Sequence, residues 1–199
     1  ILTIGTDCSG IEAPVQALHN MGVKFFHIFA SDNDPKVRET ISANPKLRAL
    51  TYFEDITQRN SMSMPSVDIY IAGFPCQSFS TAGKQQGFQD EKGRGLIFQH
   101  IYDYIRWNRP KVFILENVQC LTTLNNGECL RYIIQQLVNI RDTHKTKRQS
   151  YTIHHQILNT RDHGIPHNRP RWYCVGIRKD CYRAGPSGQR FQFPSPIPV

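Results

Sequence analysis

The stretch KVFILENV, residues 111–118, decides the fold of this chain. Its apolar run is typical of a buried strand and ends abruptly in an acid and an amide. Similar runs alternate along the sequence with segments whose apolar residues recur at helical spacing. That alternation predicts an α/β fold with a doubly wound, mostly parallel sheet covered by helices.

The remaining strands are predicted from further apolar runs, and the helices from apolar residues that recur at helical spacing. The expected strands are residues 1–5, 24–31, 50–56, 67–73, 151–159 and 171–178. Helices are expected around Ile11, Val15 and Leu18, around Ile97, Ile101, Tyr104 and Ile105, and around Leu130, Ile133, Ile134, Leu137 and Ile140. A further helix is expected within residues 32–45, with Asp32 or Asp34 as its cap and Pro35 in its first turn.

The net charge and the lengths of the apolar runs limit the classes of protein to which the chain can belong. The chain has 199 residues and a formal net charge of +8, which favours a polyanionic partner, although solubility alone would also explain the charge. No apolar run approaches the roughly 18 residues that span a bilayer, and no signal peptide is visible, so an intracellular protein is expected.

Cysteine and histidine spacing gives no sign of a metal site. The six cysteines never form a C-x-x-C pair, which argues for reduced thiols rather than a zinc ribbon or a disulfide scaffold. His163 and His167 flank Gly164 and Pro166 and cannot share a helix face, so no metal is expected.

Polar residues follow the predicted strands at the points where ligands bind to open parallel sheets. Asp32 and Asp55 follow the second and third strands, Cys76 follows the fourth, and Glu116 follows the fifth. After the first strand, TDCSGIEA turns into a helix N-terminus, which favours an anionic group. Asp32 is placed to bind the hydroxyls of a ribose, and it could equally cap the next helix.

Cys76 has three interpretations from its local sequence. A buried structural cysteine would lie inside the apolar run, whereas Cys76 lies beyond it between Pro75 and Gln77. A metal ligand would need spaced partners, which are missing. A nucleophile would need acid–base groups from other strand ends, for which Glu116 is a candidate, and the local sequence favours this interpretation.

These motifs resemble those of the carbon-5 cytosine methyltransferases, which use S-adenosylmethionine. GFPCQSFS is similar to their nucleophile motif, LENV to their Glu-Asn-Val motif and GIPHNRPRWY to their Gln-x-Arg-x-Arg motif. EDIT and GRGLIFQHI also match, so the resemblance covers nearly the whole chain in the family's order. The fold it implies is Rossmann-like.

The resemblance implies a role for each catalytic residue. Cys76 would add as a thiolate to carbon 6 of cytosine, and Glu116 would hold ring nitrogen 3 and the exocyclic amine. Arg171 would hold the base oxygen and position the acid and thiol, with Arg169 supporting it. Otherwise the two arginines would be surface charges on a strand edge. Because carbon 5 is inaccessible inside a duplex, the base would be flipped out, and residues 78–95 would form a lid over it.

The resemblance also implies a binding site for S-adenosylmethionine, whose product is S-adenosylhomocysteine. Asp32 would bind the ribose, Asp55 the adenine amino group with Ile56 packed beside it, and Gly73 and Pro75 would line the methyl end. The cofactor would further lie along Cys8, Ser9, Gly10 and Ile11. The chain departs from the family at Cys8, which stands for Phe, at Glu12, which stands for the second glycine, and at His167, which stands for Gln.

The expected organisation is a catalytic domain over residues 1–183 and an exit linker over 184–199. The chain starts at Ile1 and ends in FQFPSPIPV, so we interpret it as a piece of a longer protein whose target-recognition region lies in a following segment or a separate chain. The expected activity is DNA cytosine-5 methylation, in the nucleus of a eukaryote or the cytoplasm of a prokaryote. A tRNA-modifying relative, in which a second proline replaces Phe74, and a non-catalytic binding module are the alternatives.

Overall fold

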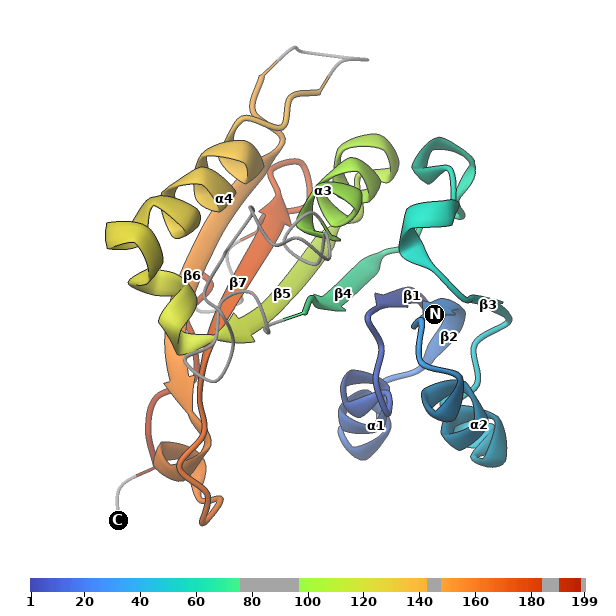
Figure 1. Ribbon diagram of the computed structural model, residues 1–199. Coiled ribbons are helices and arrows are strands. Elements are labelled where there is room, and N and C mark those ends of the chain that lie inside the picture. Colours follow the sequence, from blue (N-terminus) through green and yellow to red (C-terminus); the bar gives the residue numbers. More distant parts are fainter. Residues whose placement is uncertain (76–96, 143–147, 184–189, 198–199) are drawn as a thin grey trace.

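The computed structural model describes residues 1–75, 97–142, 148–183 and 190–197. They form a seven-stranded sheet in the order β3-β2-β1-β4-β5-β7-β6, which confirms the doubly wound α/β fold (Figure 1). The strands are β1 (Leu2–Asp7), β2 (Phe25–Ser31), β3 (Thr51–Phe53), β4 (Ile69–Gly73), β5 (Val112–Val118), β6 (Tyr151–Asn159) and β7 (Pro170–Arg178). Neighbouring strands are parallel except where β7 pairs with β5 and β6.

Helices cover the sheet on both faces (Figure 1). They are α1 (Ala13–Asn20), α2 (Pro35–Ala43), α3 (Ile97–Asn108) and α4 (Glu128–Val138). Helices α3 and α4 lie on one face, and α1 and α2 lie on the other face below β1 to β3 (Figure 1). Among the described residues, no helix covers that second face below β4, β5 and β7 (Figure 1).

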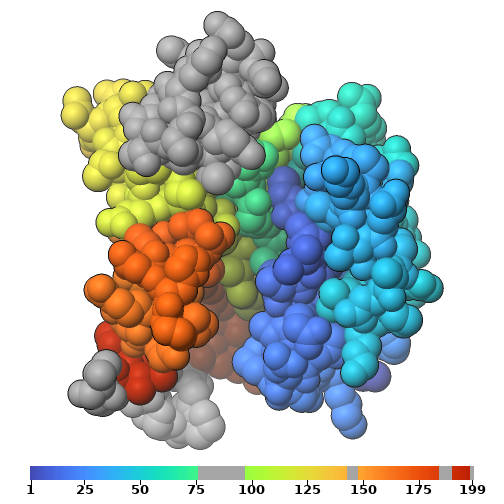
Figure 2. Space-filling view, turned by 60° about the horizontal axis from the view of Figure 1, so that its bottom comes forward, coloured from blue at the N-terminus to red at the C-terminus, as the bar shows by residue number. Residues whose placement is uncertain are grey.

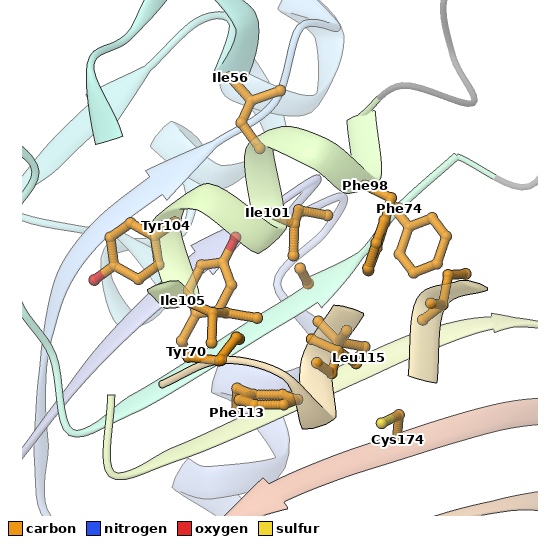
Figure 3. Close-up of a cluster of buried hydrophobic side chains, with 14 of the residues drawn as sticks. Ile56, Tyr70, Phe74, Phe98, Ile101, Tyr104, Ile105, Phe113, Leu115 and Cys174 are labelled. Carbon is orange, nitrogen blue, oxygen red and sulfur yellow. The ribbon is translucent and has the colours of Figure 1, made fainter. Parts of the chain in front are cut away.

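The main core lies between the sheet and helices α3 and α4 (Figure 3). Side chains alternate between the faces of a strand, so every second residue enters this core. Tyr70 of β4, Phe113 and Leu115 of β5 and Trp172 of β7 are fully buried there. Intervening residues therefore face the opposite side, and this places Gly73, Glu116 and Arg171 on one face.

Some predicted boundaries were wrong for local reasons. Ile11 was expected on the buried face of the first helix, but α1 begins at Ala13 and Ile11 is 66% exposed. Glu12 precedes the helix in a left-handed conformation, which ends the turn rather than starting the helix. The third strand is shorter than expected, because Asp55 accepts a hydrogen bond from the Thr57 amide and opens a short 3-10 turn.

The antiparallel direction of β7 follows from its connection to β6. Only residues 160–169 separate the two strands, whereas a parallel pair needs a crossover of a dozen or more residues. The end of the described chain returns to this hairpin: the Ile197 amide donates to the carbonyl of Asp162, and the Phe191 amide donates to the Tyr182 hydroxyl. Within the described segments, every helix is too short or too polar to cross a membrane.

Candidate active site

Two neighbouring cavities lie where the strands β1, β2, β4 and β5 end. The first has a volume of about 300 Å³ and the second about 630 Å³. Figure 2 shows the hollow between the N-terminal segment, in blue, and the β6–β7 hairpin, in orange. Five residues line both cavities, namely Cys8, Gly73, Glu116, Arg169 and Arg171.

The structure brings the described residues of the predicted site together. The first cavity is also lined by Asp32, Asp55, Ile56 and Pro75, and the second by Ser9, Gly10 and Ile11. Cys76 lies outside the described residues, as does the predicted lid over residues 78–95. The nucleophile assignment therefore stays a prediction, with Pro75 marking where the chain leaves the described cavity wall.

Glu116 and Arg171 form the ion pair of the site. Glu116 pairs in register with Tyr173 across the β5–β7 ladder, so Arg171 is its diagonal neighbour on the same face. The Arg171 Nε lies 3.0 Å from Glu116 Oε1, and the two side chains are 19% and 32% exposed. The Arg171 Nη1 also donates to the carbonyl of Pro170 over 2.8 Å, which fixes the guanidinium.

Burial and two neighbouring arginines act in opposite directions on the pKa of Glu116. Burial raises the pKa of the carboxyl above its ordinary value, although Arg171 and Arg169 act in the opposite direction. Gly73 lies beside it in the β4–β5 register, and a Cβ atom there would stand 3.3 Å from Glu116 Oε2. Because glycine has no Cβ atom, it leaves room for the carboxyl group of Glu116 at this position.

Asp32 connects the ends of β1 and β2. Its Oδ2 accepts a hydrogen bond from the Gly10 amide over 2.9 Å, and its Oδ1 accepts from the Asp34 amide over 3.0 Å. Asp34, not Asp32, caps α2 by accepting from the Lys36 amide. The choice that the sequence left open is thereby resolved, and Asp32 is left to line the first cavity.

Asp55 and Ile56 line the first cavity on the side opposite Glu116 and Arg171. Asp55 Oδ1 accepts hydrogen bonds from the amide and the hydroxyl of Thr57, both over 2.8 Å, which fixes its carboxylate. Ile56 is 6% exposed and packs into the main core. One polar and one apolar side chain are thus adjacent in the lining of this cavity.

Asn117 is a site residue whose role the sequence did not reveal. It is 1% exposed, its Nδ2 donates to the carbonyl of Phe74 over 3.3 Å, and its Oδ1 accepts from the Val118 amide over 2.8 Å. The side chain thus ties β5 to the segment that leads into Cys76. An amide in phase with Phe113 and Leu115, on the core-facing side of the strand, was the signal that could have identified it.

Glu12 is buried beneath the loop that follows β1. It is completely inaccessible to solvent, its Oε1 accepts from the Thr6 hydroxyl over 2.7 Å, and His27 Nε2 lies 3.1 Å from the same hydroxyl. Burial raises the pKa of Glu12 to about 8. Burial also raises the pKa of the Cys8 thiol, so Cys8 remains a neutral lining residue.

The polar side chains that line the first cavity are mainly carboxylates and guanidinium groups. Within the described part of the chain, no three His, Cys, Asp or Glu residues are grouped so as to hold a metal ion. The five described cysteines are free thiols. Carboxylates and an acid–arginine pair thus line the same cavity.

Structural comparison shows which solved structures share the fold. The fold is similar to Dnmt2 methyltransferase of S. pombe, with a TM-score of 0.67, 20% identity, and coverage of 93% of this chain and 53% of that one. It is also similar to a putative DNA modification methyltransferase from an E. coli prophage, with a TM-score of 0.69, 20% identity, and coverage of 99% and 53%. The chain therefore shares its fold with these two proteins.

Sequence comparison gives the family. The family model described as C-5 cytosine-specific DNA methylase matches residues 7–198, and the chain belongs to that family. It is 36% identical over 171 residues to type II methyltransferase M.NgoBI of Neisseria gonorrhoeae and 40% identical over 143 residues to M.HhaI of Haemophilus parahaemolyticus. These matches cover 86% and 72% of this chain but 47% and 39% of the two relatives, so the chain spans less than half of their length.

Proposed function

We propose that this chain is the catalytic part of a DNA cytosine-5 methyltransferase that uses S-adenosylmethionine. The observation that carries the proposal is the Glu116–Arg171 pair, 3.0 Å apart, at the edge of a cavity whose far wall holds Asp32 and Asp55. An acid whose pKa is raised by burial lies beside a cation on one side, and groups suited to adenosine lie on the other. The names of the relatives, all of them methyltransferases, agree with this arrangement.

The first cavity suits the adenosine part of the cofactor. Asp32 has acceptor capacity toward the cavity for the ribose hydroxyls, and Asp55 for the adenine amino group, with Ile56 against the ring. Cys8, Ser9, Gly10 and Ile11 would follow the rest of the molecule, toward Gly73 and Pro75. When bound, S-adenosylmethionine supplies a methyl group on a sulfonium centre.

The reaction that we assign to the chain's residues begins with the thiolate of Cys76 adding to carbon 6 of a flipped-out cytosine. As the bond forms, Glu116 donates its proton to ring nitrogen 3, and the ring electrons move to carbon 5, which becomes nucleophilic. Arg171 orients the Glu116 carboxyl and binds the base oxygen, and Arg169 adds positive charge at the same edge. After methylation, a base takes the carbon-5 proton, the thiolate of Cys76 leaves carbon 6, and the proton on ring nitrogen 3 returns to Glu116, so that the aromatic ring and the enzyme are both restored.

The domain assignment is part of this proposal. Residues 1–183 would form the catalytic domain, and 184–199 would lead toward a target-recognition region on a further segment or a separate chain. The second cavity supports this, because Ile71 and Ile114 face it from the sheet and α1 contributes Ala17. By the family resemblance, a helix from the remaining part would pack beside the cofactor on this side. DNA and the cofactor would be the partners, and the location would be intracellular.

The test is a covalent trap. The protein is incubated with S-adenosylmethionine and DNA containing 5-fluorocytosine, which blocks the last elimination, and the adduct is separated on a denaturing gel. We expect an adduct with the wild-type protein and none with Cys76→Ser. An absent adduct, or one that survives Cys76→Ser, refutes the proposal, and an adduct with 5-fluorocytosine-containing tRNA in place of DNA supports the tRNA-modifying alternative.

A further inference from the structure

A buried ion pair joins two segments that line the cavities. Asp7 is the last residue of β1 and precedes Cys8, whereas Arg59 follows the 3-10 turn Ile56–Gln58. The Arg59 Nη1 donates to Asp7 Oδ1 over 2.5 Å, and its Nη2 donates to Asp7 Oδ2. The arginine side chain is 5% exposed and the aspartate side chain is inaccessible, so this two-pronged contact lies inside the protein.

Aromatic rings enclose the pair. The Arg59 guanidinium carbon lies 5.4 Å from the ring centre of Phe29, 5.7 Å from that of Phe53 and 5.8 Å from that of Tyr104. The Tyr70 hydroxyl donates to Asp7 Oδ2 over 2.5 Å. Burial is the largest single influence on the pKa of Arg59 and acts to lower it, but the charge and hydrogen bonds of Asp7, together with Tyr70 and Tyr104, raise it overall. The guanidinium therefore stays charged among rings that favour a cation.

A buried ion pair seldom stabilises a protein more than apolar residues of the same volume would. What it adds is a fixed geometry, because a planar guanidinium that binds both oxygens of a carboxylate permits little movement of either segment. One segment here leads directly into Cys8, and the other carries Asp55 and Ile56. All three of these residues line the first cavity.

We propose that Asp7 and Arg59 are a positioning pair that holds the Asp55–Ile56 wall of the first cavity at a set distance from Cys8, and thereby sets the affinity for the adenosine part of the cofactor. The inference rests on the proposed function, because it takes that cavity to be the cofactor site. Arg59 lines neither cavity, and Asp7 lines the second cavity but not the first, so the pair acts on the first cavity through the residues that it holds.

The test replaces both charges at once, because removing one partner leaves an unpaired buried charge and threatens folding. The variant is Asp7→Leu/Arg59→Met. The matched control is Arg109→Met/Asp142→Leu, which removes a pair of 2.8 Å whose side chains are 19% and 13% exposed and which lines neither cavity. Affinity for S-adenosylhomocysteine and for adenosine is measured by calorimetry, together with the melting temperature.

We expect both ligands to bind about tenfold more weakly to the Asp7→Leu/Arg59→Met variant, since a small misplacement of contact groups costs that much. The control should bind within about twofold of the wild type. In methyl transfer, the variant should show a raised KM for S-adenosylmethionine at an unchanged kcat, because Glu116 and Arg171 are untouched. Hydrogen exchange of the Thr57 and Gln58 amides should also become faster, which a merely stabilising role would not require.

Arg59→Lys keeps the test decisive if the double variant does not fold. It retains the charge but not the two-pronged contact, and we expect an affinity for S-adenosylhomocysteine about threefold weaker than that of the wild type. If the double variant folds and binds S-adenosylhomocysteine with wild-type affinity, the inference is overturned. If the double variant does not fold, wild-type affinity in Arg59→Lys overturns it. Either result leaves the proposed function intact. A wild-type protein that binds neither ligand overturns both.

Discussion

Glu12→Gln should remove a pH dependence from the stability of this protein. Glu12 is inaccessible to solvent, and its Oε1 accepts from the Thr6 hydroxyl, whereas its Oε2 has no hydrogen-bond partner among the described residues. Burial raises the pKa of this carboxyl from its ordinary 4.5 to about 8. A glutamine has nearly the same shape, can still accept from Thr6, and does not titrate.

The sign of the effect follows from proton binding. Between about pH 4.5 and about pH 8 the folded protein holds a proton on Glu12 that the unfolded chain has released. The stabilising contribution is therefore complete below pH 4.5 and is lost as the pH rises through about 8. The free energy of unfolding should fall by at most ~1.4 kcal/mol per pH unit in this range, and by roughly 5 kcal/mol in total as an upper bound.

His27 sets the part of this range in which the measurement is clean. Burial lowers its pKa, so its own contribution is complete above its ordinary value of 6.5 and is lost at lower pH, where it would oppose the effect of Glu12. Urea unfolding followed by tryptophan fluorescence is therefore measured at several values between pH 6.5 and pH 8. Glu116 also has a raised pKa, but it is present in both proteins and cancels in the comparison.

The expected result is a sloping stability for the wild type and a flatter one for Glu12→Gln, with the variant the more stable of the two near pH 8. Equal slopes would show that Glu12 is not the group that titrates. A variant that is less stable by the same amount at every pH would show instead that the proton resides on His27, opposite a charged Glu12. Either outcome would refute the reasoning.

Three further substitutions test the candidate site and its support. Gly73→Ala places a Cβ atom 3.3 Å from Glu116 Oε2, so the rate of the covalent trap should fall by about tenfold while the affinity for S-adenosylhomocysteine changes little. Arg171→Lys loses the planar contact to Glu116 and should slow the trap by at least about tenfold in single-turnover measurements, whereas an unchanged rate would show that the ion pair is incidental. Gly176→Ala forces a Cβ atom into the ring of Phe113 and should lower the free energy of unfolding by roughly 1–3 kcal/mol in urea, with kcat unchanged in the surviving folded protein.

Much of the fold could be predicted because each strand and helix follows from the spacing of apolar residues within its own segment. Apolar runs such as Val112 to Leu115 predicted the strands, and helical spacing at Ile101, Tyr104 and Ile105 predicted α3 with its buried face. The boundary near Ile11 was wrong because the left-handed conformation of Glu12 ends the turn before the helix, and the boundary near Asp55 was wrong because its hydrogen bond from the Thr57 amide opens a 3-10 turn.

The sequence by itself determined the order of the strands and helices along the chain, the residues at the strand ends and, through its motifs, the family. Only the tertiary structure decided which of those residues meet. Glu116 and Arg171 are in contact because of the β5–β7 register, and Asp7 and Arg59 because β1 and the turn after Asp55 pack against the same aromatic core. The spacing of apolar residues in the sequence fixes the face of a strand or helix on which a side chain lies. Strand register and packing between distant segments decide which other side chain it contacts, and the chemistry of the site depends on that contact.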